Sequence, residues 1–367
     1  MSSSVPIVGV VRGRGAKSSH TGRFESATRE DFDDGWDGAD AEPAKLRTTL
    51  TPEAARTIIA RNDSPDIGFD RSINPYRGCE HGCIYCYARP SHAYMGLSPG
   101  LDFESRLFFK PEAASLLERE LSKPGYRPAR IQLGANTDPY QPIERDLKIT
   151  RDVLKVLAAF NHPLGITTKN VLVTRDIDIL APMAAKNMAV VAVSVTTLDR
   201  KLARAMEPRA STPDRRIEAI RRLSQAGVPC LIGFAPCIPG LNDHELEAVL
   251  ERGAEAGAVG AYFTMLRLPL EIKDLFREWL SAERPDRAAR VMSLVRQTQG
   301  GKDYDPEWGR RMRGQGPIAE LVARRFKLAA SRFGLNQPRE AMNLALFRVP
   351  PKAGDQMSLF GEDGLTG

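Results

Sequence analysis

The sequence has 367 residues, of which 42% are hydrophobic and 27% are charged. This composition is ordinary for a globular protein, so collagen-like, mucin-like and fully disordered proteins are excluded. No apolar run approaches the roughly 20 residues that cross a bilayer. The apolar patch at residues 5–11 precedes the nearby basic residues, which is the wrong order for a secretory signal. We therefore expect a cytoplasmic protein that makes no membrane contact.

The formal net charge is +6, from 52 Lys and Arg against 46 Asp and Glu. An excess this small allows an acidic partner such as DNA or RNA without requiring one. Basic residues gather in residues 310–332, where Glu320 is the one acid. They are Arg310, Arg311, Arg313, Arg324, Arg325, Lys327 and Arg332. A solvated helix face and a polyanion-binding surface explain this run equally well, and both readings stay open.

The chain begins with a segment that has no regular pattern. Residues 1–50 are rich in Gly, Ser, Asp and Arg, so we expect a disordered extension with one short contact near residues 22–24. The next residues, 51–60, predict a short helix, because Thr51 can cap it and Pro52 suits its first position.

From residue 71, short β-branched strands alternate with amphipathic helices. Strands are expected at 72–77, 130–134, 164–168, 189–195, 228–235 and 259–266. Helices are expected at 111–122, 150–160, 176–187, 212–226, 243–256 and 271–281. This alternation predicts parallel βαβ units with helices outside the sheet. Six units fit an incomplete barrel or a doubly wound sheet, and periodicity alone does not decide. We assign residues 51–285 to this domain.

A smaller α/β appendage is expected over residues 286–350. Residues 316–334 predict an amphipathic helix that stops at Gly334, and residues 343–349 alternate like a strand. Pro350 and Pro351 end the folded part, and residues 351–367 are expected to be a disordered tail.

The most informative stretch is a cysteine-rich loop. Cys79, Cys83 and Cys86 fall within eight residues, and clustered cysteines in a cytoplasmic chain indicate metal rather than disulfides. Three thiolates at C-x3-C-x2-C can bind three irons of a four-iron four-sulfur cluster and leave the fourth iron open. Zinc is the alternative, since His81 and a further cysteine could complete four ligands.

The motif Cys79-x3-Cys83-x-Tyr85-Cys86, placed after the first strand of a βα series, resembles the signature of radical S-adenosylmethionine (SAM) enzymes. The resemblance covers about residues 70–280. It implies a partial (β/α)6 TIM barrel with the cluster at the C-terminal mouth of the strands. It also implies that SAM chelates the open iron, and that an electron from a low-potential donor cleaves SAM to methionine and a 5′-deoxyadenosyl radical.

Within that superfamily, the chain resembles the spore photoproduct lyase-like branch. Tyr85 and Tyr87 resemble the tyrosines that flank its third cysteine and are implicated in radical relay. Residues 134–138 resemble its segment after the second strand. Lys169 and Ser194, which end the third and fourth strands, match its SAM-contacting lysine and serine.

The segment after the second strand has two readings. Asn136, Thr137 and Asp138 can form an Asx turn that closes the loop, or they can bind SAM together with Tyr85. Lys169 is either a surface lysine or a clamp on the SAM carboxylate.

One departure from the lyase concerns its hydrogen-donating cysteine. Ala135 stands in its place, so we do not carry over repair of the spore photoproduct and assign the chain to an uncharacterised bacterial subgroup. Cys237, at the mouth of the fifth strand, could donate a hydrogen atom instead. The alternative is an inert thiol in a proline-rich turn.

The tail carries a second motif. The peptide Gln356-Met357-Ser358-Leu359-Phe360 resembles the short segment by which bacterial replication and repair proteins dock on the DNA polymerase sliding clamp. Leu359 and Phe360 would anchor in a pocket and Gln356 would provide polar specificity.

Together these features predict a radical SAM enzyme that acts on a nucleic-acid or nucleotide substrate, with DNA repair as a candidate process. The alternatives are a radical SAM enzyme that modifies tRNA or protein, and a non-enzymatic iron–sulfur or zinc adaptor.

Overall fold

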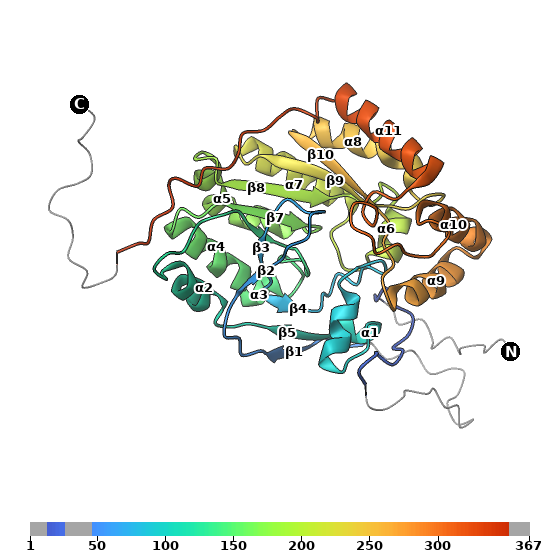
Figure 1. Ribbon diagram of the computed structural model, residues 1–367, viewed down its shortest axis with the longest axis horizontal. Coiled ribbons are helices and arrows are strands. Elements are labelled where there is room, and N and C mark those ends of the chain that lie inside the picture. The colour runs from blue at the N-terminus through green and yellow to red at the C-terminus, as the bar shows by residue number, and fades with distance from the viewer. Residues whose placement is uncertain (1–12, 26–45, 352–367) are drawn as a thin grey trace.

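The computed structural model describes residues 13–25 and 46–351. Its centre is a sheet of six parallel strands that follow one another in chain order (Figure 1). They are β3 (Arg71–Ile73), β6 (Ile131–Leu133), β7 (Leu164–Thr168), β8 (Ala189–Ser194), β9 (Cys230–Cys237) and β10 (Gly260–Met265). The outer edge of β3 pairs antiparallel with β2 (Ile59–Arg61) instead of meeting β10, so the sheet stays open. The expected partial (β/α)6 fold is confirmed.

Helices connect the strands and cover one face of the sheet, close to the predicted positions (Figure 1). The connecting helices are α2 (Ala113–Leu121), α4 (Ile149–Ala159), α5 (Ile177–Ala184), α7 (Pro213–Gln225) and α8 (Leu246–Glu255). Shorter elements are η1 (Arg89–Met95), α1 (Leu101–Ser105), α3 (Glu144–Leu147), η2 (Val171–Asp176), α6 (Arg200–Met206) and η3 (Asp243–Glu245). After β10 come α9 (Ile272–Glu283), α10 (Pro285–Thr298) and α11 (Gly316–Arg332).

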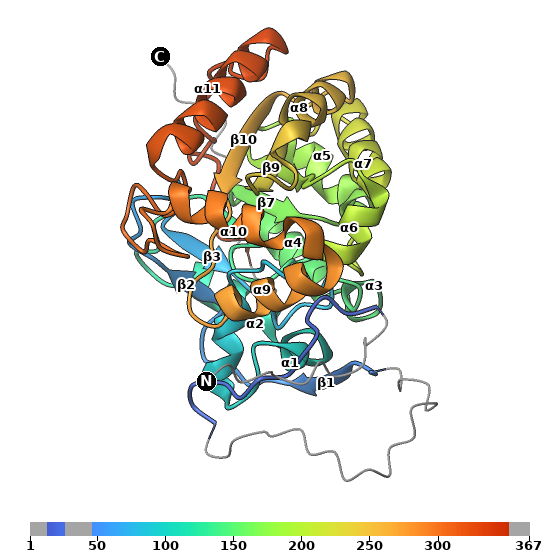
Figure 2. The same ribbon diagram turned by 90° about the vertical axis from the view of Figure 1, so that its right-hand side faces the viewer.

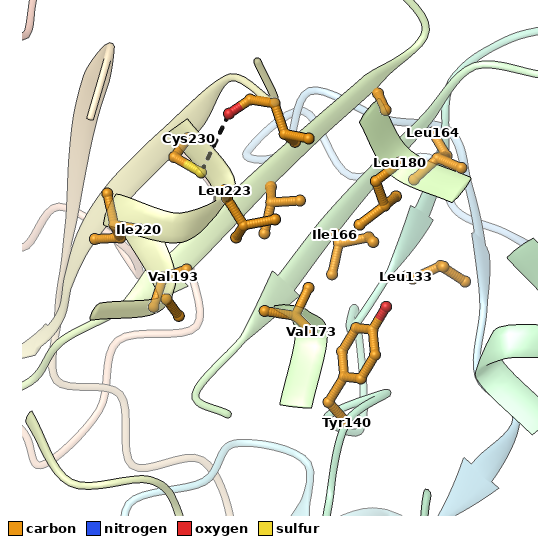
Figure 3. Close-up of a cluster of buried hydrophobic side chains, with 14 of the residues drawn as sticks. Leu133, Tyr140, Leu164, Ile166, Val173, Leu180, Val193, Ile220, Leu223 and Cys230 are labelled. Atoms are coloured by element: carbon orange, nitrogen blue, oxygen red, sulfur yellow. Dashed lines mark hydrogen bonds between the residues drawn. The ribbon is translucent and has the colours of Figure 1, made fainter. Parts of the chain in front are cut away.

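The two faces of the sheet differ in chemistry. The face under the helices is a continuous apolar core, in which Leu133, Ile166 and Val193 pack against α5 and α7 (Figure 3). Side chains alternate between the two faces along each strand. Residues that are paired in register on neighbouring strands therefore point together into the interior of the partial barrel. That face carries small or polar residues. They include Ser72, Gln132, Gly165, Thr167, Ser194 and Gly233.

Three local predictions are wrong. Residues 51–60 contain no helix; β1 (Thr49–Pro52) instead pairs with β5 (Arg106–Phe109) in a second sheet that also contains β4 (Tyr76–Arg77). Residues 343–349 form no strand, because their backbone amides bond to the ends of other elements: Asn343 to Asn187 and Arg348 to Phe160. The disorder predicted for residues 1–50 fails at residues 14–18, which are buried.

The appendage is helical in the part that the structure describes. The predicted helix at 316–334 is present as α11, which packs against α8 and places Phe326 4.7 Å from Phe263 of β10. Arg325 on this helix is not free for a polyanion, because it forms an ion pair with Glu247 at 2.6 Å. No helix within residues 13–25 and 46–351 has the length and apolar character to span a membrane.

Candidate active site

The cysteine loop follows β4, a few residues after β3 ends at the carboxyl edge of the parallel sheet. Cys79 and Cys83 are buried and Cys86 is partly buried. Gly78 and Gly82 adopt left-handed backbone angles, with φ of 75° and 65°, which favour glycine. A Cβ atom on Gly78 would lie 2.5 Å from the Leu107 side chain, so the tight fold of the loop requires glycine there.

The three thiols share one environment. Burial raises the pKa of each of them, and the charges of Cys83, Cys86 and Asp138 raise the pKa of Cys79 further. Lys169 acts in the opposite direction on Cys83 and Cys86. Thiolates in such a place require a bound cation or cluster for stability.

The two readings of the cysteine loop, a cluster and a single zinc ion, make different demands on the donor atoms. Within the described residues, no three His, Cys, Asp or Glu side chains converge closely enough to hold a single metal ion. A structural zinc site needs four ligands around one point, whereas thiolates that bind three separate irons only need to surround the cluster.

A fully buried arginine fixes the backbone of the loop. Arg89 donates hydrogen bonds to the carbonyl oxygens of Cys83 at 2.9 Å and Gly82 at 3.1 Å, and it forms an ion pair with Glu104. Because a buried charge is costly without partners, this pair holds η1 and α1 to the loop.

The N-terminal strap, residues 13–25, lies against the same loop. Glu104 accepts hydrogen bonds from the backbone N–H groups of Gly15 at 2.9 Å and Ala16 at 2.8 Å. A Cβ atom on Gly15 would lie 1.9 Å from the carbonyl oxygen of Gly82. Further along, Lys17 pairs with Glu283 of α9 at 2.6 Å. The strap therefore covers the loop and ties it to α9.

Lys169 and Ser194 meet at the carboxyl ends of β7 and β8. Lys169 Nζ donates to Ser194 Oγ at 3.0 Å and lies 5.8 Å from the centroid of the Tyr85 ring. Ser194 Oγ in turn donates to the carbonyl oxygen of Ala235 at 3.0 Å. Lys169 is thus not a loose surface lysine, since its ammonium points across the interior face beside the cysteine loop.

Asp138 organises the loops around it. Its carboxylate accepts from the Lys169 N–H at 2.7 Å and the Thr168 hydroxyl at 2.7 Å, and it lies 3.3 Å from His81 Nδ1. Burial alone would raise the pKa of Asp138, but His81 and these donors lower it below its usual value. The Tyr140 N–H also donates to it at 2.8 Å, which is the expected Asx turn.

Thr137 and Asn136, which precede Asp138, differ in how exposed their side chains are. Thr137 is buried and donates its hydroxyl to the carbonyl oxygen of Tyr76 at 3.0 Å. Asn136 is partly exposed, and its backbone N–H donates to the Asn74 side chain at 3.0 Å. Asn136 is therefore better placed than Thr137 to offer its side chain to a ligand.

The two tyrosines of the motif face different surroundings. The buried Tyr85 hydroxyl donates to Glu207, whose carboxylate forms a buried ion pair with Arg216. Tyr87 is 44% exposed, and its hydroxyl donates to the carbonyl oxygen of Ala135. Tyr87 thus contacts Ala135, two residues beyond the end of β6.

Cys237 is not brought to the cysteine loop. Its thiol is fully buried in the apolar core, and burial raises its pKa. The charged groups near it, Asp243, Glu247 and Arg325, belong to the outer helices or to the turn that precedes them. This location fits the inert-thiol reading of Cys237. The predicted motif at residues 356–360 lies outside the described residues.

Sequence reasoning missed several residues. Glu207 and Arg216 lack a pattern that marks them as a buried pair, and the strap gives no periodic signal. Arg267 was detectable, because it lies two residues beyond the end of β10, and polar residues at strand ends also mark the site at β7 and β8. A pocket of about 310 Å³ between α4 and α5 lies on the outer side of the sheet and does not belong to this site.

Comparison with known proteins agrees with this geometry. A family model for the radical SAM superfamily matches residues 73–253. An uncharacterized protein of Mycobacterium tuberculosis is 35% identical over 263 residues, which cover 71% of this chain and 76% of the relative. An uncharacterized protein of Methanocaldococcus jannaschii is 30% identical over 173 residues, covering 47% of this chain and 62% of that one.

Solved structures show the same fold. Spore photoproduct lyase complexed with dinucleoside spore photoproduct superposes with a TM-score of 0.56 and 15% identity, over 81% of this chain and 84% of that chain. A variant of the same enzyme with bound AdoMet and dinucleoside spore photoproduct also gives a TM-score of 0.56, at 16% identity and the same coverage. The chain belongs to the radical SAM superfamily. Its fold is similar to that of spore photoproduct lyase, and it is an enzyme.

Proposed function

We propose that this enzyme binds a four-iron four-sulfur cluster through Cys79, Cys83 and Cys86, cleaves SAM, and acts on a nucleic-acid or nucleotide substrate. The observation that carries the proposal is the group of three thiols, two of them buried and one partly buried, on a glycine-shaped loop at the carboxyl edge of the sheet. When bound, the cluster supplies the electron that cleaves SAM into methionine and a 5′-deoxyadenosyl radical.

The residues of the chain position and shield this chemistry. Lys169 offers a cation to the SAM carboxylate, and Ser194 holds that ammonium in place. Asp138 keeps the Lys169 backbone and Thr168 fixed, while the exposed side of Asn136 offers a polar contact. The strap limits water at Gly82. An enclosed site prevents side reactions of a radical.

The nucleic-acid assignment rests on fold-level similarity to a lyase whose solved complex contains a dinucleoside, and on the mild basic charge. In the sequence resemblance, Ala135 stands where that lyase has its hydrogen-donating cysteine, so we do not carry over repair of the spore photoproduct. DNA repair enters as the candidate process through the proposed sliding-clamp peptide at residues 356–360.

The test begins with anaerobic reconstitution of the full chain. We expect about four irons with matching sulfide per chain, and release of 5′-deoxyadenosine when SAM and dithionite are added in place of the cellular low-potential donor. Cys83→Ala should abolish both properties. Cys230→Ala, the same substitution in the apolar core, should retain them, because Cys230 lies on the helix-covered face (Figure 3).

Two results would contradict the proposal. One zinc ion per chain without sulfide, in protein isolated anaerobically, would favour the adaptor reading. A normal cluster without any 5′-deoxyadenosine would separate iron binding from SAM chemistry and remove the enzymatic proposal.

A further inference from the structure

Arg267 lies at the mouth of the partial barrel and forms no ion pair among the described residues, although the Asp66 carboxylate, which Arg311 binds, is close enough to interact with its charge. It follows β10 by two residues, and its guanidinium lies 5.1 Å from the centroid of the Tyr87 ring, next to Cys86 in sequence. Its Nε atom is buried and has no hydrogen-bond partner among the described residues. A buried donor without a partner is costly, so such an atom indicates a missing ligand.

The connection between α10 and α11 lies beside Arg267. Its Met312 carbonyl oxygen accepts from the Met265 N–H at 2.9 Å, at the end of β10. Arg311 bonds to Asp66 and Ser64, in the turn between β2 and β3, so the connection spans the open side of the sheet (Figure 2). Arg267 and this connection therefore form one rim.

The basic residues of this connection differ in whether they form ion pairs. Arg310 pairs with Glu307 at 2.9 Å and Arg311 pairs with Asp66, so both are engaged. Arg313 is exposed and forms no ion pair within the described residues. It lines a pocket of about 210 Å³ together with Pro65, Asp66, Gly309 and Met312. Asp66 is already bonded by Arg311 and by the Gly309 N–H at 2.6 Å.

We propose that Arg267 and Arg313 bind a backbone phosphate of a single-stranded nucleic acid and position the strand at the mouth of the barrel. This inference deepens the proposed function and depends on its nucleic-acid substrate. Arg267 and Arg313 each lie within two residues, in sequence, of the Met265–Met312 backbone contact, and neither forms an ion pair among the described residues. Planar guanidinium groups bind phosphate oxygens bidentately. Phosphate contacts set the register of a strand.

A single strand fits this rim because an aromatic side chain stands beside the cations. Trp308, next to Gly309 on the same connection, is 55% exposed. Exposed aromatic rings stack on unpaired bases, and such platforms occur together with cationic grooves that follow the phosphates. A duplex would keep its bases stacked and leave Trp308 without a partner.

The experiment measures binding of fluorescein-labelled oligothymidylate and oligouridylate, each of about 12 nucleotides, to the full reconstituted chain by anisotropy. Arg267→Gln and, separately, Arg313→Gln should each weaken binding about tenfold. Each should reduce the slope of log affinity against log salt by about 0.7, as expected for one lost phosphate contact on a single strand. Arg290→Gln, at an exposed cation of α10, is the matched control and should change neither quantity.

The outcomes separate this inference from the proposed function. Equal binding by the wild type and both variants, equal losses in the Arg290 control, or no oligonucleotide binding by a chain that cleaves SAM would each overturn the phosphate site. Binding that depends on Arg267 and Arg313 in a chain that does not cleave SAM would support the site and contradict the proposed chemistry. Arg313 is exposed, so its variant tests the site even if Arg267→Gln fails to fold.

Discussion

At the scale of single residues, Lys169 has the most specific position. Its ammonium contacts Ser194 and faces the Tyr85 ring, and burial lowers its pKa even though the nearby Cys83 thiolate and Asp138 raise it. A partly buried ammonium with one neutral hydroxyl partner can accept a carboxylate as a further partner. Lys169→Met should therefore weaken SAM binding by about tenfold or more, as expected for a lost charge-assisted hydrogen bond.

Equilibrium dialysis of the reconstituted chain with labelled SAM measures this effect. Lys186→Met is the control, because Lys186 is exposed and its ammonium, among the described residues, bonds to the Asn161 side chain at 3.3 Å. Unchanged SAM affinity in the Lys169 variant would show that Lys169 does not bind SAM and has a purely structural role.

A second residue makes folding depend on pH. His162 is fully buried beside Phe347, and its Nε2 lies 2.9 Å from the Tyr126 hydroxyl. Burial lowers the pKa of His162 to about 4, from 6.5. The unfolded chain therefore binds the proton first as the pH falls, and the free energy of unfolding should decrease between about pH 6.5 and 4.

Urea unfolding at several pH values tests this linkage. Complete passage through the window should cost about 3 kcal/mol for His162. His162→Gln should reduce the pH dependence without abolishing it, because burial also lowers the pKa of His92 to about 4. Identical pH slopes in the wild type and the variant would refute the assignment.

At the scale of elements, the strands and helices of the barrel were predictable because each buries one apolar face. β7 (Leu164–Thr168) matches its predicted range, and α7 and α8 lie within theirs. The wrong predictions concern segments whose conformation depends on residues far away in the sequence. β1 forms because β5 lies beside it, and residues 343–349 follow other elements through single hydrogen bonds. Local sequence does not contain such partners.

The strap allows an element-scale prediction. Gly15→Ala places a Cβ atom 1.9 Å from the Gly82 carbonyl oxygen, so the strap must move away from the cysteine loop. Overpacking of this kind costs about 1–3 kcal/mol, which makes the open state about tenfold or more populated. The thiols of the metal-free variant should therefore react with iodoacetamide about tenfold faster, as measured by mass spectrometry.

Gly68→Ala is the matched control, because a Cβ atom there meets no other atom within 4 Å and the backbone angle is ordinary. It should leave the alkylation rates unchanged. Equal rates for the Gly15 variant and the wild type would mean that the strap does not shield the loop.

At the scale of the whole molecule, the sequence predicted where the site lies better than it predicted which residues belong to the site. The cysteine motif and the strand-end residues Lys169 and Ser194 were found because parallel strands bring their carboxyl ends to one edge. Cys237 also follows this rule in sequence, yet its side chain turns into the helix-covered core. Sequence spacing gives the edge of a sheet but not the face on which each side chain lies.

The barrel and the C-terminal tail are expected to have separate functions. We propose that residues 356–360, which follow Pro350 and Pro351 in sequence, deliver the enzyme to DNA through the sliding clamp. An extended peptide loses conformational entropy on binding, so its affinity should be about micromolar. Most of it should come from Leu359 and Phe360, at roughly 1.5–3 kcal/mol for each side chain on full burial.

Changing Leu359 and Phe360 together to Ala should therefore abolish binding of the full chain to a purified bacterial clamp in surface plasmon resonance. The same variant should release 5′-deoxyadenosine at the wild-type rate, because the cysteine loop lies in the barrel, more than 250 residues earlier in the chain. The peptide 352–367 alone should bind the clamp, and its double-Ala form should not. Equal binding by both peptides, or none by either at high micromolar concentration, would leave the DNA-repair proposal supported by the barrel alone.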